Sequence, residues 1–354
     1  MPDEDRKKRI KAEYLRSFSY EVLREVGVRE KEANIVADVL VATDLWGVDS
    51  HGIAHLERYV ERIGDGEINL EPTIKMETKS PTTAVMDGDN GFGFVAGVKS
   101  MKQAMEMATE YGSGFVSVRN STHFGAAFYY AMMPLEKDMI GISLTVGGRC
   151  MKAPLSKGQA GGLNPIAVAV PAEKKHPFVI DMSTSVVAGG QVEIAKRRGN
   201  QIPEGWVVDE EGNPITDPDR INCGDPDWKG GFLPLGGSPE TGAFKGFGLS
   251  VLVNLLCTTL SGATPGTSAN HFFGAFKVDG FRPAGEFKRS VDELIESIES
   301  LPSMEEENRL FAPGGLEAQI KKERKTEGVP LDDKVYDSLM TLSKRTDVPL
   351  EDQI

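Results

Sequence analysis

The chain has 354 residues, 40% of them hydrophobic and 26% charged, which is enough to bury a large core in two domains or one elaborated domain. The formal net charge of −13 argues against a nucleic-acid partner, because neutralising phosphates requires clustered Lys and Arg. We expect no membrane partner, since the sequence has no run of roughly 18 apolar residues and its charged N-terminus has no apolar signal segment.

The three cysteines, Cys150, Cys223 and Cys257, lie far apart and show no C-x-x-C spacing. We therefore expect neither a disulfide framework nor a zinc site, and we expect a reducing, cytoplasmic compartment. His51 and His55 are four residues apart and could share a helix face, but no glutamate lies between them as in H-E-x-x-H. The sequence therefore predicts no metal.

Hydrophobic periodicity predicts helices at both ends of the chain and alternating strands and helices between them. An α/β chain with α+β character is the expected fold class. The predicted strands lie at 83–87, 115–118, 140–145, 166–170, 178–181 and 275–278. The predicted helices lie at 5–26, 30–45, 56–63, 98–111, from after His123 to about 137, and at 186–198, 250–260, 289–300, 315–324 and 332–345.

The charged, amphipathic C-terminal residues are expected to pack on the N-terminal helices. This predicts a helical domain formed by 1–75 together with 304–354, and a cofactor- and substrate-binding catalytic region at 76–303. Residues 217–244 are rich in Gly, Pro and Asp without periodicity, which is typical of a long loop that covers a site.

Four separated clusters contain residues that a polar ligand requires: Ser50-His51-Gly52, His123-Phe-Gly125, Asp181-Met-Ser-Thr184 and Lys245-Gly-Phe-Gly248. A histidine between a strand and a helix is well placed to exchange a proton near neutral pH. A purely structural interpretation stays open for each cluster: Ser50 and Asp181 as helix caps, His51 as a buried histidine, and Lys245 as a solvated side chain.

Two familiar catalytic patterns are missing. Gly91-Phe-Gly93 with Gly97 follows a strand and opens a helix, but the spacing is not G-x-G-x-x-G. No acidic residue stands about 20 positions later at a strand end, so we expect no standard Rossmann site. The sequence also lacks G-x-S-x-G, which disfavours hydrolysis by a catalytic triad.

A set of ordered motifs resembles the type 2 malate/L-lactate dehydrogenase family, which also includes sulfolactate and ureidoglycolate dehydrogenases, diketogulonate reductase and cyclic-imine reductases. The likeness covers about residues 10–345. It rests on Asp49-Ser-His-Gly-Ile53 with Tyr59, Asn120-Ser-Thr-His-Phe-Gly125, Asn164-Pro-Ile-Ala-Val168, Asp181-Met-Ser-Thr184, Ile202-Pro-Glu-Gly-Trp206, Gly212-Asn-Pro214 with Thr216-Asp-Pro218, Lys245-Gly-Phe-Gly-Leu249 and Pro313-Gly314.

The resemblance implies a homodimeric oxidoreductase that uses NAD or NADP. It also implies a cofactor domain that is not a Rossmann fold but a largely antiparallel sheet wrapped by helices. Such a domain would explain why the glycine fingerprint is absent.

The matching motifs also imply roles for individual residues. His123 is expected to be the general acid/base, with Ser50 and His51 beside it in the catalytic group. The residues expected to bind the cofactor are Asp181, Met182, Ser183, Lys245, Gly147, Gly314 and Gly315.

The chain departs from the family pattern at three places. His55 stands where relatives often have an arginine suited to clamping a carboxylate, and Arg58 follows one helical turn later. We expect both to bind substrate. Thr145-Val-Gly-Gly-Arg-Cys150 replaces a more polar segment, and Gly315 replaces the usual Glu or Gln after Pro-Gly.

The sequence therefore predicts an NAD(P)-dependent 2-hydroxy-acid dehydrogenase of malate/L-lactate type, acting on a small-molecule substrate. Two alternatives stay open. One is a reductase of another carbonyl or of a cyclic imine, and the other is a catalytically silent member of the family that only binds ligands.

Overall fold

The computed structural model describes residues 8–223, 225, 227–264, 266, 269–304 and 309–350. The first residues of the helix predicted over 5–26 lie outside this range. None of the helices in the described part of the chain has the length and apolar character needed to cross a membrane.

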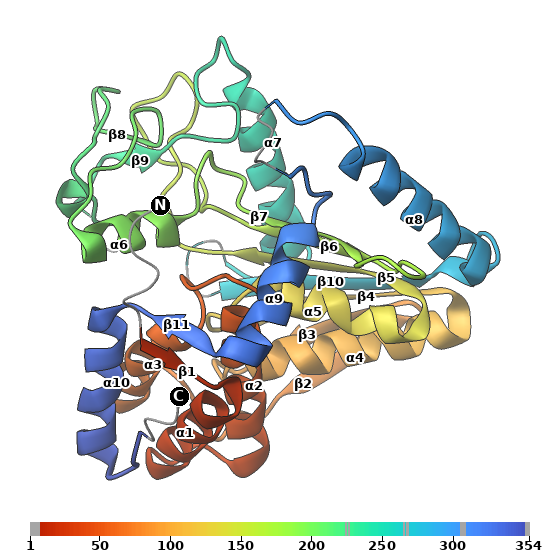
Figure 1. The fold of residues 1–354 in the computed structure, drawn as a ribbon, viewed down its shortest axis with the longest axis horizontal. Coiled ribbons are helices and arrows are strands. Elements are labelled where there is room, and N and C mark those ends of the chain that lie inside the picture. The colour runs from red at the N-terminus through yellow and green to blue at the C-terminus, as the bar shows by residue number, and fades with distance from the viewer. Residues whose placement is uncertain are drawn as a thin grey trace.

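A seven-stranded sheet runs through the middle of the molecule (Figure 1). Its strand order is β2-β3-β4-β10-β5-β6-β7, and every pair is antiparallel except β3 and β4. The strands are β2 (Lys75–Ser80), β3 (Thr83–Asp87), β4 (Ser113–Ser121), β5 (Met139–Val146), β6 (Ile166–Val170), β7 (Phe178–Met182) and β10 (Ala269–Lys277). The predicted α/β fold with a largely antiparallel sheet is confirmed.

Helices cover both faces of this sheet. On one face, α4 (Gly93–Tyr111) and α5 (Ala127–Met132) pack on the central strands through a core that includes Met101, Tyr130 and Phe273. On the other face lies α7 (Ala243–Asn254), continued by a π-helical turn over Leu255–Thr259. Figure 1 shows α4 and α5 below the sheet and α7 above it.

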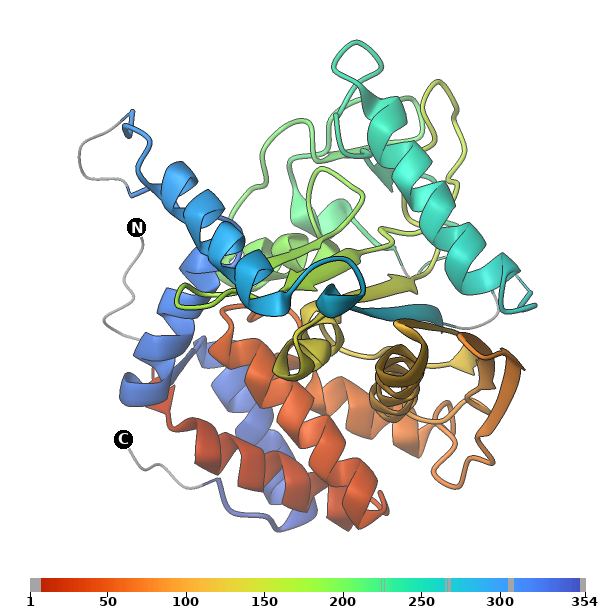
Figure 2. The ribbon, with the colours of Figure 1, turned by 90° about the vertical axis from the view of Figure 1, so that its right-hand side faces the viewer.

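The two ends of the chain form one helical layer. It contains α1 (Ala12–Glu25), α2 (Glu30–Leu45), α3 (Leu56–Gly64) and α10 (Asp333–Thr346), together with the two-stranded pairing of β1 (Lys8–Ile10) with β11 (Val329–Leu331). Leu15, Leu40 and Leu339 are buried in the same core. Figure 2 shows the N-terminal helices beside the C-terminal segment. The helical part built from both chain ends is thus confirmed, while the exact domain boundaries stay a prediction.

The remaining elements surround the sheet edge formed by β7. They are α6 (Gly189–Arg198), α8 (Ala284–Glu299), α9 (Gly315–Glu327) and the short pair β8 (Val207–Val208) and β9 (Gly231–Phe232). Helix α9 begins beside β7, where Val179 donates its amide hydrogen to the carbonyl of Pro313, and it ends beneath the N-terminal helices.

Several predicted elements have different ends in the structure, and long-range packing explains the larger differences. The helix predicted from 98 begins at Gly93, because the Thr122 hydroxyl accepts a hydrogen bond from the Gly93 amide. The strand predicted at 275–278 spans Ala269–Lys277, since it pairs along most of its length with both β4 and β5. Residues 8–10 are a strand rather than a helix because they pair with β11.

The expectation of unpaired cysteines is wrong for one pair. Cys150 and Cys223 form a disulfide across 73 residues of sequence, with a Cα–Cα distance of 5.6 Å, while Cys257 is free and buried. Cys150 is placed by backbone hydrogen bonds to Gly161 and Phe232. The irregular chain that follows the 3₁₀ turn over Pro218–Arg220 brings Cys223 to it. No local spacing in the sequence predicts that these two loops lie side by side.

Candidate active site

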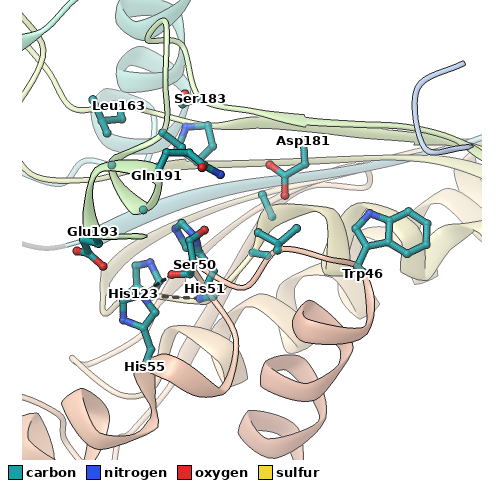
Figure 3. Close-up of a pocket in the computed structure, with 18 of the residues that line it drawn as sticks. Trp46, Ser50, His51, His55, His123, Leu163, Asp181, Ser183, Gln191 and Glu193 are labelled. Atoms are coloured by element: carbon teal, nitrogen blue, oxygen red, sulfur yellow. Dashed lines mark hydrogen bonds between the residues drawn. The ribbon is translucent and has the colours of Figure 1, made fainter. Parts of the chain in front are cut away.

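A cavity of about 410 Å³ lies between the helical layer and the end of the sheet near β7. Its wall includes seven of the residues predicted from the sequence: Ser50, His51, His55, Arg58, His123, Asp181 and Ser183. Figure 3 shows the histidines on one side of this space and Asp181 with Ser183 on the other. The structure therefore brings together residues from three of the four clusters.

The segment that carries Ser50 and His51 is held by a buried carboxylate. Asp44, on the last turn of α2, accepts a hydrogen bond of 2.7 Å from the backbone amide of Ile53, which opens a short 3₁₀ turn over Ile53–His55. A Cβ at Gly52 would overlap the Asp44 carboxylate, so only glycine lets the chain approach it this closely. This contact fixes the course of the chain between α2 and α3.

Arg324 of α9 supports the same segment from outside. Its guanidinium donates to the carbonyl of Asp44 at 2.6 Å and forms an ion pair with the carboxylate of Asp49. Arg324 is only 9% exposed, so the guanidinium is shielded from solvent, while the Asp49 side chain remains 32% exposed. The C-terminal part of the chain thus positions a loop formed near its beginning.

His55 has a defined tautomer. Its Nε2 lies 2.6 Å from the carbonyl oxygen of Ser50, and because a carbonyl only accepts, this nitrogen must carry the hydrogen. The Ser50 hydroxyl lies 2.8 Å from Nδ1 of His51. Ser50 is therefore engaged through both its backbone and its side chain, and it links the two histidines.

His123 pairs with a tyrosine inside the protein. Its Nδ1 lies 2.6 Å from the hydroxyl of Tyr59, which is 2% exposed, and 3.3 Å from the amide of Gly125. Tyr59 packs edge-on against Phe94, with ring centroids 5.1 Å apart. Nδ1 is thus occupied by the protein, which leaves Nε2 for a ligand in the cavity.

The chain around His123 is fixed by turns at the end of β4. Asn120 has a positive φ of 52° and donates to the carboxylate of Asp87 at 3.1 Å. Thr122 bridges the start of α4 by accepting from the Gly93 amide and donating to the carbonyl of Gly91. Gly125, with a φ of 79°, leaves no space for a side chain beside Phe94. The position predicted for His123, between a strand and a helix, is confirmed, since β4 ends at Ser121 and α5 begins at Ala127.

The three imidazoles form a close triangle whose ring centroids lie 5.7 to 6.0 Å apart. Burial lowers the pKa of His51 and of His55 to about 4 each, and burial together with the neighbouring His51 lowers the pKa of His123 well below its usual value. All three rings are therefore neutral at pH 7, and a neutral imidazole can accept a proton.

Asp181, at the end of β7, serves two purposes. Its carboxylate accepts a 2.8 Å hydrogen bond from the amide of Phe128 at the start of α5, so it caps a helix that precedes it in sequence. Burial raises the pKa of Asp181 to about 6. The residue keeps an exposed face toward the cavity, so water screens part of this effect.

The other predicted cofactor residues do not line the cavity. Lys245 is exposed on the first turn of α7, and Met182 is 39% exposed beside Asp181. Gly147 has open space where a side chain would lie. Gly314 and Gly315 begin α9 against β7 and His176, where a Cβ on either would be crowded by neighbouring atoms.

Some residues in the cavity wall or directly behind it are not among the predicted site residues. Tyr59 contacts His123 and stands four residues after His55 on the same helical face, which is a signal the sequence contains. Gln191 and Glu193 come from the first turns of α6, and Glu317 comes from α9. No local pattern assigns these three to the cavity, because α6 and α9 reach it only in the folded chain.

A search of the described ranges finds no group of three or more His, Cys, Asp or Glu side chains arranged to hold a metal ion. The cavity wall instead combines a neutral histidine, His123, and the carboxyl group of Asp181 with the apolar side chains of Leu163, Pro165 and Val179. Such a site can exchange a proton with a small polar ligand and exclude water from its apolar side.

Comparison with known proteins identifies similar sequences over nearly the whole chain. The family model described as malate/L-lactate dehydrogenase matches residues 10–340. A malate dehydrogenase of Pyrococcus horikoshii is 41% identical, with 96% of each chain covered. An L-sulfolactate dehydrogenase of Methanocaldococcus jannaschii is 36% identical, covering 98% of this chain and 99% of the relative.

The solved structures agree with the sequence comparison. The crystal structure of malate dehydrogenase from Entamoeba histolytica superposes with a TM-score of 0.93 at 34% identity, covering 97% of this chain and 99% of that one. The match therefore includes the helical layer, the sheet and the loops that form the cavity.

Proposed function

The chain belongs to the malate/L-lactate dehydrogenase family, and we propose that it is an NAD(P)-dependent dehydrogenase in which His123 is the general acid/base. Family membership makes it an oxidoreductase that acts on a CH–OH group, and its relatives support a 2-hydroxy-acid substrate. The choice of acid and the roles of individual residues belong to the proposal.

The observation that carries the proposal is the contact between Tyr59 and His123 at the cavity. To oxidise an alcohol, His123 must accept the hydroxyl proton on Nε2 while Nδ1 keeps its hydrogen. The Tyr59 oxygen, 2.6 Å from Nδ1, is placed to accept a hydrogen bond from Nδ1–H, and in this role it competes with the Gly125 amide, which points its N–H at the same nitrogen from 3.3 Å. In the reverse direction, protonated His123 returns the proton to the carbonyl oxygen of the 2-oxo acid.

Ser50 and His51 lie beside His123 and complete the catalytic group. The His51 ring centroid is 5.7 Å from that of His123, and its Nδ1 is bound by the Ser50 hydroxyl. A neutral His51 can hold the hydroxyl or carboxylate of the substrate by a hydrogen bond. We assign His55 and Arg58 to substrate binding, because both contribute to the same wall of the cavity.

The far side of the cavity fits a nicotinamide. A flat ring requires apolar contact on its face and polar groups at its edge, and Leu163, Pro165 and Val179 stand there beside Asp181 and Ser183. When bound, the cofactor accepts or returns the hydride of C2. We assign cofactor binding to Asp181, Met182, Ser183, Lys245, Gly147, Gly314 and Gly315, and leave NAD and NADP as equal alternatives.

We further propose a homodimer. One face of α7 and the turn after it exposes apolar side chains that this chain leaves uncovered: Phe244, Val251, Leu252, Leu255 and Leu260. A contiguous apolar stripe of this kind is typical of a protein interface. A cytoplasmic location stays a prediction from the sequence.

A substrate panel tests the function directly. The protein is given malate, lactate, sulfolactate or ureidoglycolate together with NAD or NADP. We expect NADH or NADPH to form, and the absorbance of the nicotinamide band measures it. His123→Ala should lower kcat by roughly 100-fold or more, as expected when a general base is removed, with cofactor binding retained. Near-normal kcat in this variant would refute the role of His123.

The alternatives make different predictions in the same panel. A carbonyl or imine reductase would oxidise NADPH or NADH with a cyclic imino acid and would form neither with the hydroxy acids. A silent family member would give no turnover in either direction.

A further inference from the structure

Two arginines near the cavity have no partner in the described part of the chain. Among the residues that the structure describes, neither Arg58 of α3 nor Arg197 of α6 forms a hydrogen bond or an ion pair, and Nε of Arg197 is fully buried without an acceptor. The chain has 53 acidic and 40 basic residues, so acidic partners are plentiful. Arginines that stay unpaired in such a chain indicate a site for an anion from outside.

Helix α6 places Arg197 one helical turn beyond Glu193, just outside the cavity wall. Gly189, Gly190, Gln191 and Glu193 of this helix form part of the cavity wall, and Arg197 follows Glu193 by four residues, on the same helical face. Figure 3 shows Glu193 next to the histidine triangle. Arg197 is partly buried, so its side chain lies against the protein rather than in open solvent.

The two arginines lie at different depths from the reacting group. The charge of Arg58 contributes to lowering the pKa of both His123 and His55. The charge of Arg197 contributes to lowering the pKa of His55 and opposes the rise that burial causes in the pKa of Asp44. Arg58 lines the cavity together with His123, whereas Arg197 stands outside its wall, one turn of α6 after Glu193.

We propose that Arg197 determines substrate specificity by binding an acidic group at the end of the substrate remote from the reacting carbon. Arg58 then faces the carboxylate next to that carbon. The proposal rests on the function proposed above and narrows it to 2-hydroxy acids with a second acidic group, either carboxylate or sulfonate. A guanidinium can bind two oxygens of either group at once through two of its N–H groups.

The neighbouring groups explain why the arginine on α6 is needed. His55 is neutral, and its Nε2 hydrogen is already donated to the Ser50 carbonyl, so it supplies no positive charge. Glu193 carries a negative charge in the same wall and disfavours an anion beside it. A second acidic group is accepted only if a cation compensates for Glu193, and Arg197 is the cation one turn away.

The test compares diacid and monoacid substrates in matched variants. We expect Arg197→Gln to lower kcat/KM for malate and sulfolactate by at least tenfold and to leave lactate within about twofold. Arg197→Lys should recover part of the malate activity, because it restores the charge without the two-pronged geometry. Arg198→Gln is the control: this neighbour is more exposed and already pairs with Asp332, so the ratio of malate to lactate activity should stay unchanged.

Three outcomes would overturn the proposal: an unchanged ratio of malate to lactate activity in Arg197→Gln, an equal loss for both substrates, or the same change in Arg198→Gln. If Arg197→Gln fails to fold, Arg197→Lys is the deciding variant. An unchanged ratio of malate to lactate activity in Arg197→Lys, with no loss of malate activity, would contradict the proposed role of Arg197. Malate and sulfolactate measured separately show whether the group bound is a carboxylate or a sulfonate. A wild-type protein that turns over no hydroxy acid contradicts the proposed function instead.

Discussion

Replacing Tyr59 by Phe removes one hydroxyl and leaves the aromatic ring in place. The ring keeps its edge-on packing against Phe94, while Nδ1 of His123 loses its 2.6 Å partner. The Gly125 amide, 3.3 Å away, then remains as the neighbour of that nitrogen. Because an amide N–H only donates, it favours the tautomer with the hydrogen on Nε2, which cannot accept a proton from the substrate.

The size of the effect follows from the hydrogen bond that is lost. Leaving a buried polar atom without its partner costs about 1 to 3 kcal/mol. If this cost falls on the state of His123 that accepts the proton, kcat should drop roughly 5- to 150-fold. The cofactor KM should hardly change, since Tyr59 does not face the proposed nicotinamide side of the cavity.

Steady-state oxidation of the best hydroxy acid, measured for wild type and Tyr59→Phe, checks this reasoning. Tyr129→Phe is the matched control, because it also loses a hydroxyl hydrogen bond, but its partner is Asp38 rather than His123. The control should retain wild-type kcat. A kcat within twofold of wild type in Tyr59→Phe would show that the tyrosine does not set the tautomer of His123.

Three further predictions concern the cofactor, the catalytic loop and acid stability. Lys245→Ala should raise the cofactor KM roughly tenfold through loss of a charged contact, and unchanged cofactor affinity would contradict its role. Gly52→Ala should lower the free energy of unfolding, measured in urea, by about 1 to 3 kcal/mol and reduce kcat, because the new Cβ would overlap the Asp44 carboxylate. Gly280→Ala is the control, because the space around Gly280 is open. Equal stability of the two variants would refute the contact. His51 and His55 have folded-state pKa values of about 4, below the unfolded value near 6.5, so the unfolded chain binds more protons between these values. The free energy of unfolding should therefore fall by roughly 1 to 2 kcal/mol per histidine from pH 7 to pH 5. Asp44 and Asp181 oppose part of this loss, because their pKa values are raised in the folded protein. Urea titrations at both pH values check this, and the fall should be smaller in His51→Gln; an equal fall in that variant would be inconsistent with the shift.

Much of the fold could be read from periodicity. The helix over 30–45 and the strands at 83–87 and 166–170 were predicted with their observed ends, since each has a clear apolar pattern and a local stop. The ends of β10 and the strand β1 were not, because these segments are strands only through pairing with residues far along the chain. Intrinsic strand propensity depends on the residues of the segment itself and carries no information about such partners.

The same division applies to the site. His123, Ser50 and His51 were predicted because each lies in a short motif of small and polar residues at the edge of an element. Glu193, Glu317 and Arg197 were not, because nothing in their own helices separates them from ordinary charged surface positions. They became candidates only when α6 and α9 were placed against the cavity.

The sequence by itself determined the class of the protein: the ordered motifs assign the family and the histidine that we propose as acid/base, and these depend on residue identity over short stretches. The tertiary structure decided what those residues touch. Tyr59 meets His123 across 64 residues, Arg324 supports Asp49 across 275, and Cys150 pairs with Cys223 across 73. Contacts of this range depend on how the sheet and the helical layer pack together, and no local pattern of residues specifies them.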